Sequence, residues 1–405
     1  MLEYTAPATD IDPYSPEFHD DPYAMYARLR ELGPVVRLPQ YDAWVCTRYD
    51  VVHHVLSTSE TFRSGAGVGL AHLGREEHWR RPSILLENDP PHHAGVRAAL
   101  MGVLTPQNIR RLRADLEPQA VEIVDRAIER QSFDAVADIA TPFPLRAFPD
   151  AVGLVEEGRE ALIAYGRMVF DGMGPKNDIY DAVMANADDT VAWITAQCRR
   201  DALTPGKLGA QVHAAADAGQ LTHEEAALVV RSFLSAGIDT TIHALGSCLL
   251  ALAQRPEQWR RVHEQPALVK RAFEETLRFE SPFQKFCRTS TGPTRLADVD
   301  VAADEKVLLL VGSANRDPGR WEDPDRFDIG RNPVGHLGFG TGIHGCVGQM
   351  IARLEADVLL GELARRVESV ELTGEPEWQP SNSLRGLRSL PLRITPAPAG
   401  AAGGT

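Results

Sequence analysis

A glycine-rich loop that ends in a cysteine constrains this chain more than any other feature. It spans Phe339–Gly348, with the sequence Phe-Gly-Thr-Gly-Ile-His-Gly-Cys-Val-Gly, and an apolar run with helical spacing follows it to Leu363. Glycines such as Gly340 and Gly342 allow backbone conformations and close approaches that a side chain would prevent. The following helix points its free N–H groups and positive dipole end toward Cys346. The loop can therefore wrap a flat cofactor and hold a thiolate against it.

A thiolate in this setting suits ligation of haem iron, because a cysteine ligand pushes electron density toward the metal. A buried cysteine in a glycine-rich turn is the plainer interpretation, and it is usually correct for a lone cysteine. The order of phenylalanine, spaced glycines and cysteine favours the haem ligand instead. The pattern resembles the haem-binding loop of the cytochrome P-450 family. That resemblance implies that Cys346 is the axial ligand of haem b and that Phe339 and Gly340 lie beside the haem.

Composition is typical of a large globular enzyme. The chain has 405 residues, of which 43% are hydrophobic, so it can bury an extensive core. It contains no uninterrupted apolar run long enough to span a membrane, and its N-terminal segment is polar and acidic, without a leader pattern. A net charge of −14 disfavours nucleic acid and anionic membranes as partners. Five scattered cysteines argue against a disulfide framework or a zinc cluster. We therefore expect a cytoplasmic protein.

Helical spacing dominates and predicts a mainly α fold with small sheets, as the resemblance to the P-450 fold also implies. No linker divides the chain, so 1–405 is predicted to be one catalytic unit with flexible ends at 1–11 and 397–405. Residues 63–89 are rich in glycine and proline and are expected to be irregular. The helices expected before the cysteine loop are 22–32, 50–56, 91–104, 107–130, 157–172, 178–200, 222–254 and 266–279. Strands are expected at 35–38, 43–47, 306–310 and 390–394.

Glu275 and Arg278 lie three residues apart in the predicted helix 266–279, so they share one face and can form an ion pair. Most pairs with this spacing are solvated, so the motif alone is weak. Its place before the cysteine loop resembles the Glu-x-x-Arg element of the P-450 family. The resemblance implies a buried, structural pair tied to a further arginine, either Arg326 or Arg331. A buried network of this kind specifies packing more than it adds stability.

The longest predicted helix, 222–254, contains Ala236-Gly237-Ile238-Asp239-Thr240-Thr241. A glycine inside a helix costs about 1 kcal/mol relative to alanine, so it needs a reason. Threonines can bond backward to helix carbonyls and bend the helix. An ordinary kinked core helix is one interpretation. The stretch also resembles the oxygen-activation motif of the family, which implies room for O2 beside Ala236 and Gly237 and a proton relay through Asp239 and Thr240.

Haem propionates need cations or hydrogen-bond donors. His93 and Arg97 lie one turn apart in the predicted helix 91–104. Each by itself would be an ordinary surface residue. Together with Arg288 and His336, they resemble the propionate-binding positions of the family.

Candidate substrate contacts lie on two segments. Ser232, Ala236 and Thr240 step by four residues and so line one helix face. Ser232 is then about 12 Å along the helix from Thr240, roughly the length of a para-substituted aromatic ring. The irregular segment 79–83, Trp-Arg-Arg-Pro-Ser, supplies guanidinium and hydroxyl groups suited to a carboxylate. The plainer interpretation is that its arginines and Arg231 are surface charges.

Four stretches resemble the bacterial P-450s that oxidise para-substituted benzoates, namely 79–83, 230–237, 279–282 and 312–318. The resemblance implies that the carboxylate is held by Arg80, Ser83 and Ser232, with Arg231 beside them. It also implies that Phe170 and Phe286 enclose the aromatic ring.

Two positions depart from that pattern. Met173 stands where a second phenylalanine is expected, and Phe283 stands where a smaller aliphatic residue is expected near the haem. A flexible thioether loosens one wall of the pocket, whereas a larger ring tightens another. The preferred para substituent therefore stays open.

The resemblance implies a haem-thiolate monooxygenase that uses O2 to convert 4-methoxybenzoate to 4-hydroxybenzoate and formaldehyde. The chain has no four-cysteine cluster and no attached flavin module, so the implied electron donors are a separate ferredoxin and its reductase. Candidates for a basic docking patch, or simply solvated residues, are Arg110, Arg111, Arg113 and Arg353. A monomer is expected.

Three other functions stay open. A peroxide-driven haem-thiolate peroxygenase is expected to lack an acid–threonine pair such as Asp239–Thr240, which this chain has. A P-450 for another small aromatic or fatty acid would share every haem motif. A haem-thiolate sensor, which is not an enzyme, would need neither a proton relay nor a carboxylate anchor.

Overall fold

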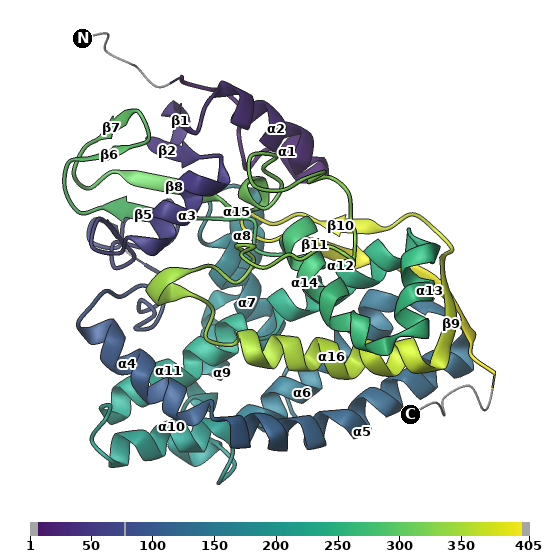
Figure 1. Ribbon diagram of the computed structural model, residues 1–405. Coiled ribbons are helices and arrows are strands. Elements are labelled where there is room, and N and C mark those ends of the chain that lie inside the picture. The colour runs from purple at the N-terminus through teal and green to yellow at the C-terminus, as the bar shows by residue number, and fades with distance from the viewer. Residues whose placement is uncertain (1–6, 77, 399–405) are drawn as a thin grey trace.

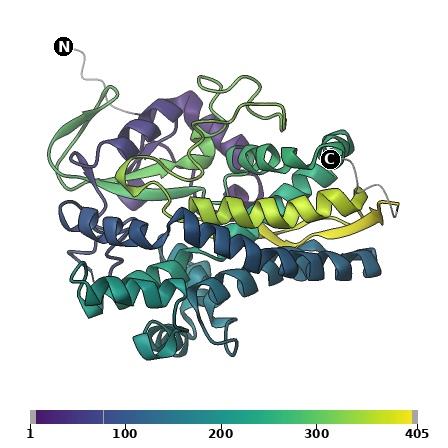
Figure 2. The same ribbon diagram turned by 60° about the horizontal axis from the view of Figure 1, so that its bottom comes forward.

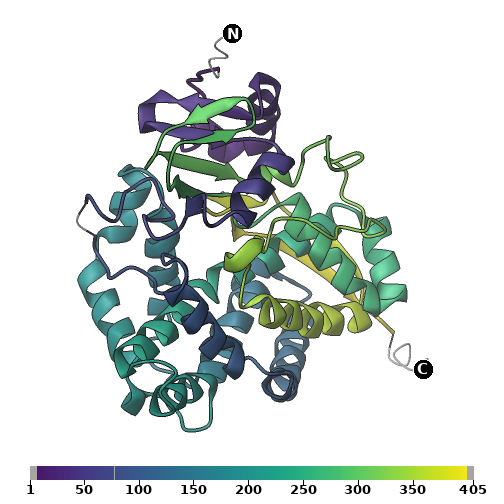
Figure 3. The same ribbon diagram turned by 60° about the vertical axis from the view of Figure 1, so that its left-hand side comes forward.

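The computed structural model describes residues 7–76 and 78–398 (Figure 1). Most of this part of the chain is helical, and a sheet-rich part lies at one side, as predicted. Figure 3 shows the sheet above the helical body. Its strand order is β1 (Val35–Leu38), β2 (Ala43–Cys46), β8 (Lys306–Leu310), β5 (Lys285–Ser290) and β3 (Phe62–Arg63).

The strands of this sheet follow the apolar runs of the sequence. β2 and β8 are parallel, and the other neighbours are antiparallel. β8 lies in the middle and is buried along its whole length, which suits its run of valine and leucine. A three-stranded sheet has the order β4 (Ser132–Asp134), β12 (Pro391–Pro396) and β9 (Val367–Leu372). Two further sheets are hairpin-like pairs: β10 (Glu377–Gln379) with β11 (Gly386–Ser389), and β6 (Thr294–Leu296) with β7 (Val299–Val301).

The helical body forms most of the core. Its longer helices are α2 (Pro22–Leu32), α3 (Tyr49–Ser57), α4 (His92–Val103), α5 (Pro106–Arg130), α6 (Pro142–Val152), α7 (Ala161–Asp171), α9 (Ala187–Gln197), α10 (Leu208–Asp217), α11 (His223–Ala236), α12 (Asp239–Ala253), α13 (Pro256–Glu264), α14 (Val269–Phe279) and α16 (Gln349–Arg366). The shorter ones are α1 (Pro16–Asp20), α8 (Asp178–Met184), α15 (Val311–Ala314) and the single turns η1 (Pro39–Tyr41), η2 (Val136–Ala140), η3 (Arg200–Ala202), η4 (Pro266–Leu268) and η5 (Gly342–His344).

Two of the long helices, α5 and α16, lie side by side across the body (Figure 2). α5 begins where the Thr105 hydroxyl accepts from the amide of Asn108 at 3.2 Å. α11 begins with the predicted capping box, in which Thr222 and Glu225 bind each other's backbone amides.

The structure corrects the predicted helices in two places. The stretch 222–254 is divided into α11 and α12 at Gly237, so the expected bend becomes a break in the helical hydrogen bonding. The stretch 178–200 is two helices, α8 and α9. The predictions also missed α1, α6, α10 and α13. α6 starts with prolines, which are tolerated in a first helical turn because its N–H groups need no partner there.

The ends of the described chain form backbone hydrogen bonds with other segments. The amide of Thr9 donates to the carbonyl of Arg37 at 3.0 Å, and the amide of Arg37 donates to Pro7 at 2.8 Å. The amide of Ala397 donates to the carbonyl of Arg366 at 2.8 Å. The flexibility predicted for 1–11 and 397–405 stays a prediction. Residues 1–6 and 399–405 of these predicted ends lie outside the described residues.

One helical stretch, His223–Ala253, is long and apolar enough to span a membrane by length and composition alone. It is 78% buried inside the protein over its most apolar window. This degree of burial is that of a core helix.

Candidate active site

The glycine-rich loop ends at the start of α16, as predicted, and its backbone is folded tightly. Gly340 and Gly342 have φ angles of +65° and +69°, a region that glycine enters at little cost. A side chain at Gly342 would also collide with the carbonyl oxygen of Leu56. The amide of Cys346 donates to the carbonyl of Phe339 at 2.8 Å, which closes the loop. The turn itself therefore requires glycine at both positions.

Cys346 differs from the other four cysteines because it is only partly buried, whereas they are buried. Burial nevertheless raises the pKa of its thiol, and this rise is opposed by the amides of Gly348 and Gln349 and by Arg97 and Arg353. The amides at the helix N-terminus thus favour the thiolate, as predicted, but the effect of burial on the pKa is larger. A coordinating metal deprotonates a thiol outright, so metal binding would reverse this balance.

Four basic side chains from three segments meet near the loop. His93 and Arg97 come from α4, Arg288 comes from β5, and His344 comes from the loop itself. The rings of His93 and His344 are 4.3 Å apart between centroids. Arg97 donates to the carbonyl of Gly345 at 2.7 Å. Three members were predicted, and His344, two residues before the cysteine, was missed.

This cluster carries an excess of positive charge. Burial lowers the pKa of His344 to about 3, and Arg288, His93 and Arg97 add to the decrease. Burial also lowers the pKa of Arg288 to about 10. The Nε2 atoms of His93 and His344 are buried without a hydrogen-bond partner among the described residues. A pair of carboxylates would supply both partners and counter-charge, so the cluster fits the propionates of a haem.

His336, the fourth residue predicted to bind a propionate, contacts an acid in this structure. Its Nε2 is 2.9 Å from a carboxylate oxygen of Glu274, and Arg353 donates to the same carboxylate. Glu274 on α14 therefore binds His336, whereas His344, which was not predicted, lies in the cluster with His93.

Asp239 and Thr240 begin α12 at the break between the two helices. The Thr240 hydroxyl donates backward to the carbonyl of Ala236 at 2.9 Å, as predicted. Asp239 is 4% exposed, and its Oδ2 has no hydrogen-bond partner in the described structure. Burial raises its pKa to about 7, against the effect of Arg167. A pKa near neutrality suits a group that must take up and release protons.

Two glycines let other helices pack closely around this acid. A Cβ added at Gly166 in α7 would lie 2.5 Å from Oδ2 of Asp239. A Cβ added at Gly237 would lie 2.5 Å from the ring of Phe148 in α6. Gly237 was expected to make room for O2, which stays a prediction, and the structure shows that close packing against Phe148 requires this glycine.

A second buried acid, Glu355 of α16, was missed by sequence reasoning. It is 1% exposed, and neither carboxylate oxygen has a hydrogen-bond partner among the described residues. Burial raises its pKa to about 8, opposed in part by the side chain of Thr241. Two buried acids thus lie near the first turn of α12. The one sequence signal for Glu355 is its place among the apolar residues of α16, where a charged side chain is unusual.

The predicted Glu-x-x-Arg pair is buried, and the structure decides its third member. Arg278 donates to both carboxylate oxygens of Glu275 at 2.8 Å, and both side chains are 0% exposed. Arg331 donates to the same carboxylate at 3.2 Å. Arg326 instead contributes its carbonyl oxygen, which accepts from Arg278 at 3.2 Å. Arg331 therefore completes the network.

The two serines of the predicted carboxylate site come together. The Oγ atoms of Ser83 and Ser232 are 3.2 Å apart, joining the irregular segment to α11. Arg231 lies next to them and donates to the carbonyls of Arg81 and Pro82 at 2.8 and 3.1 Å.

Arg80 is not free in the way that the sequence suggested. Its guanidinium donates to both carboxylate oxygens of Glu87, at 2.8 and 3.2 Å. Met173 borders a small cavity together with both of these residues and Trp79. The carboxylate site therefore contains an acid of its own.

Phe283 lies between the two phenylalanines that were expected to enclose a substrate ring. It stacks on Phe286 with centroids 4.9 Å apart and an angle of 7°. It meets Phe170 edge to face at 5.6 Å and 66°. The guanidinium of Arg288 lies 4.9 Å from the centroid of Phe286. The ring of Phe283 thus contacts both residues that were predicted to enclose a substrate ring, and that enclosure stays a prediction.

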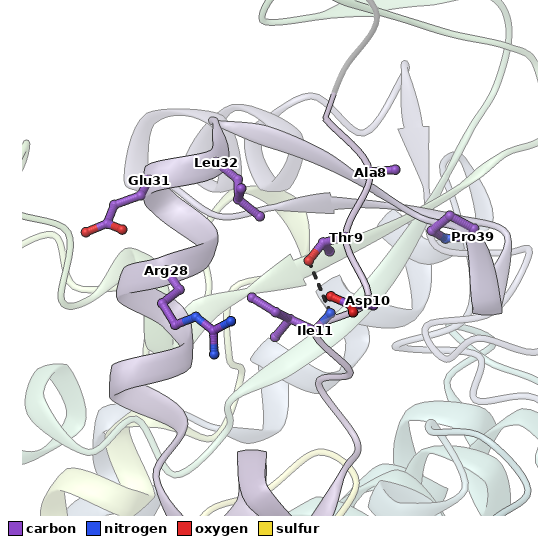
Figure 4. Close-up of a pocket in the computed structure, with 8 residues that line it drawn as sticks. All are labelled: Ala8, Thr9, Asp10, Ile11, Arg28, Glu31, Leu32 and Pro39. Atoms are coloured by element: carbon purple, nitrogen blue, oxygen red, sulfur yellow. Dashed lines mark hydrogen bonds between the residues drawn. The ribbon is translucent and has the colours of Figure 1, made fainter.

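Of the open cavities that lie outside this group of residues, two differ in their relation to the site. One, of about 680 Å³, is at the N-terminal segment, where Asp10, Arg28 and Glu31 lie around it (Figure 4). The other, of about 420 Å³, is beside α7 and α8 and is lined in part by Arg167 and Asp171. The first contains no residue of the candidate site. The second borders it through Arg167.

Comparison with known proteins decides the family. Residues 186–394 match the family profile of cytochrome P-450. The chain is 45% identical to cytochrome P-450 CYP199A2 of Rhodopseudomonas palustris over 392 residues, which is 96% of this chain and 95% of that protein. The chain belongs to the cytochrome P-450 family.

Solved structures agree with this assignment. This P-450 is similar to CYP109Q5 from Chondromyces apiculatus, with a TM-score of 0.83 and 31% identity over 98% of this chain and 100% of that one. It is also similar to the P-450 CREJ, solved in complex with (4-ethylphenyl) dihydrogen phosphate, with a TM-score of 0.84 and 27% identity over 95% and 99% of the two chains.

Family membership confirms the predicted fold, cofactor and reaction class. A P-450 binds haem and is a monooxygenase that uses O2 and electrons from a redox partner. The residues described here fit that cofactor, because they bring together a glycine loop with a thiol, a cluster of basic groups without enough anions, and a buried acid beside a threonine.

Proposed function

We propose that this P-450 is a ferredoxin-dependent monooxygenase of para-substituted benzoic acids, which converts 4-methoxybenzoate to 4-hydroxybenzoate and formaldehyde. The observation that carries the proposal is the Ser83–Ser232 hydroxyl pair at 3.2 Å, with Arg80 and Arg231 beside it. Hydroxyl and guanidinium groups together bind a carboxylate well. The similarity to a P-450 solved with a para-ethylphenyl phosphate supports a substrate with an anionic group opposite a para substituent.

The haem site that we propose uses Cys346 as the thiolate ligand. The propionates would be held by His93, Arg97, Arg288 and His344, and Phe339 and Gly340 would lie along the loop beside the ring system. When bound, haem supplies the activation of O2 and the oxidation of a substrate C–H bond. The protein contributes the position of the substrate, the exclusion of water and the control of protons.

Proton delivery is assigned to Asp239 and Thr240. Burial holds the pKa of Asp239 near 7, so its carboxyl group exchanges protons at physiological pH. The Thr240 hydroxyl donates its hydrogen to the carbonyl of Ala236. Its oxygen can therefore accept a hydrogen bond, and then a proton, from Asp239. Asp239 is buried, so its carboxyl group is shielded from bulk water. Ala236 and Gly237, at the end of α11, border the proposed O2 position.

The proposed reaction balances with two electrons and two protons from outside the chain. One oxygen atom of O2 enters the para-methoxy methyl group, and the other leaves as water. The resulting hemiacetal breaks its O–CH2 bond, which releases formaldehyde and leaves the phenol. The carboxylate takes no part in the chemistry, and it serves only to orient the ring.

The electrons would come from a ferredoxin and its reductase in the cytoplasm, and we propose that the enzyme acts as a monomer. Of the four arginines predicted for the docking patch, Arg110 and Arg111 are exposed and form no ion pair within the described part of the chain. Arg113 pairs with an acid of α16, and Arg353 pairs with Glu274. Arg110 and Arg111 are therefore the better candidates for contact with an acidic partner.

Ligand titration of the haem-containing protein tests the carboxylate anchor. The Soret band should shift as 4-methoxybenzoate binds, whereas 4-methoxybenzamide and the methyl ester should bind about 10- to 100-fold more weakly, because lost hydrogen bonds to a charged group cost about 1.5–3 kcal/mol. Ser232→Ala should remove the advantage of the acid. Ser235→Ala is the matched control, since its hydroxyl donates to the carbonyl of Ser232 and not to the anchor.

Equal binding of acid, amide and ester would contradict the proposal and indicate a P-450 for another small aromatic molecule. A peroxygenase would form the phenol from hydrogen peroxide as efficiently as from ferredoxin and O2. A sensor would bind ligands and form no product with either.

A further inference from the structure

The end of the pocket assigned to the substrate carboxylate already contains a carboxylate. Glu87 accepts two hydrogen bonds from Arg80, at 2.8 and 3.2 Å, and one from the amide of Ser83 at 2.7 Å. The side chains of Arg80 and Glu87 are only 11% and 8% exposed. A bidentate ion pair with this burial has a fixed geometry and is poorly screened by solvent. The positive charge of Arg80 and the negative charge of Glu87 therefore both act on a ligand in this site.

The second cation of the site is left without an acid. Arg231 donates to the backbone carbonyls of Arg81 and Pro82, and it forms no ion pair with an acid among the described residues. The exposed acid Glu224, one turn or more away on α11, pairs with Arg81 at the surface. Two guanidinium groups and one carboxylate thus give the anchor a single net positive charge.

The serine hydroxyls add hydrogen bonds to the anchor without adding charge. The Ser232 hydroxyl donates to the carbonyl of Leu228 at 2.9 Å, and the Ser83 oxygen accepts from the amide of Leu86 at 3.1 Å. The Ser83 proton is then the one that bridges the two oxygens, which are 3.2 Å apart. This hydroxyl can rotate and donate to an incoming anion instead, which breaks only the weak Ser83–Ser232 hydrogen bond.

We infer that Glu87 sets the charge of this anchor, so that the enzyme selects monoanionic aromatic acids and rejects dianions as well as neutral analogues. The inference rests on the proposed function. Glu87 neutralises Arg80, so a singly charged carboxylate is balanced by Arg231. The second charge of a phosphate ester would be repelled by Glu87 at low dielectric. Lys306, the further cation on the side of Glu87, already donates to the carbonyls of Ala66 and Gly67.

The test uses three probes with the same methoxyphenyl group and the haem-containing protein at pH 8. An aryl phosphate monoester is then mostly a dianion, because its second pKa is about 6. The wild type should bind 4-methoxybenzoate at least about 10-fold more tightly than 4-methoxyphenyl phosphate. It should bind 4-methoxybenzenesulfonate, a monoanion with three oxygens, nearly as well as the benzoate. Dissociation constants come from the Soret shift and from calorimetry.

Glu87→Gln keeps the shape of the side chain and an oxygen that can accept from Arg80, but it raises the charge of the anchor by one. The phosphate should then gain about 10-fold in affinity relative to the benzoate. Glu224→Gln is the matched control, because it makes the same change in net charge on the exposed partner of Arg81. It should leave the ratio unchanged.

The outcomes separate the inference from the function on which it rests. A phosphate-to-benzoate ratio that is the same in Glu87→Gln and in the wild type overturns the inference, while preference for the benzoate over its amide still supports the function. The inference is also overturned if the sulfonate binds the wild type as weakly as the phosphate does, because the shape of the group and not its charge would then determine affinity. This comparison needs no variant. No preference for the benzoate over the amide in the wild type means that the proposed function itself is wrong.

Discussion

The ring of Phe283 is the side chain expected to decide which para substituents fit. It stacks on Phe286 and meets Phe170 at its edge, so it forms a wall where a substrate ring was predicted to lie. It is also only partly buried, unlike its two neighbours, so it faces the space that they border. Truncation of this side chain therefore enlarges the pocket without removing a group from the anchor.

Phe283→Val should shift the preference of the enzyme toward longer para substituents. One methylene group in a hydrophobic pocket changes specificity by about 10-fold or more. The ratio of kcat/KM for 4-ethoxybenzoate to that for 4-methoxybenzoate should rise by about this factor, and the preference for acid over amide should not change. Phe133→Val, in β4, controls for a general loss of packing. An unchanged ratio in Phe283→Val would mean that this ring does not contact the para group.

Some site residues could be found from the sequence and others could not, for a physical reason. Cys346, Asp239 and the Glu275–Arg278 pair lie in contiguous motifs whose geometry is local. Pairings between distant segments depend on the fold, so the choice of Arg331 over Arg326 needed the structure. The Arg80–Glu87 pair was also missed, because it lies within an irregular segment whose turns have no regular period.

Among the secondary structure elements, the contact between α7 and α12 matters most for the proposed chemistry. Gly166 in α7 allows the backbone of that helix to approach the carboxylate of Asp239, where a Cβ would lie 2.5 Å from Oδ2. The position of the acid is therefore set by a glycine on another helix. The close approach also completes the burial that raises the pKa of Asp239 to about 7.

Gly166→Ala should displace Asp239 and uncouple the reaction. Overpacking of a tight contact typically costs about 1–3 kcal/mol of stability. Less product should form per NADH consumed and more hydrogen peroxide should appear, while the affinity for 4-methoxybenzoate changes little. Gly95→Ala in α4 is the control, because an added Cβ there meets nothing within 4 Å. Full coupling in a folded Gly166→Ala protein would show that the position of Asp239 does not control proton delivery.

Elements with strong local signals were predicted well. The capping box of Thr222 and Glu225 marks the start of α11, and the strands 35–38 and 306–310 agree with β1 and β8. The break between α8 and α9 has no proline or glycine to indicate it, so periodicity alone joined them. α6 was missed because its prolines are normally taken as an end of helical structure.

For the whole molecule, stability depends on pH through buried groups whose pKa changes on unfolding. Burial raises the pKa of Glu355 to about 8 and that of Asp239 to about 7. Such an acid contributes stability that is present below its unfolded pKa and is lost as the pH rises through its folded pKa. Burial lowers the pKa of Lys285 to about 7, which has the opposite effect, because stability then increases as the pH rises above 7. The opposite effects of the acids and of Lys285 on the free energy of unfolding therefore overlap near neutral pH.

Glu355→Gln isolates the acid from this overlap. Glutamine is neutral at every pH and has nearly the shape of the protonated acid, so Lys285 and the other groups cancel when the two proteins are compared. The free energy of unfolding of the wild type minus that of the variant should fall between about pH 4.3 and pH 8, by up to about 1.4 kcal/mol per pH unit. Urea unfolding of the haem-containing proteins at several pH values measures this difference. In Glu122→Gln the difference should stay constant over that range, because Arg146 and Arg126 lower the pKa of Glu122 below its usual value and neither arginine titrates there. A flat difference for Glu355→Gln would show that Glu355 is ionised in the folded protein, and its buried carboxylate would then need a partner such as the Thr241 hydroxyl or a bound water.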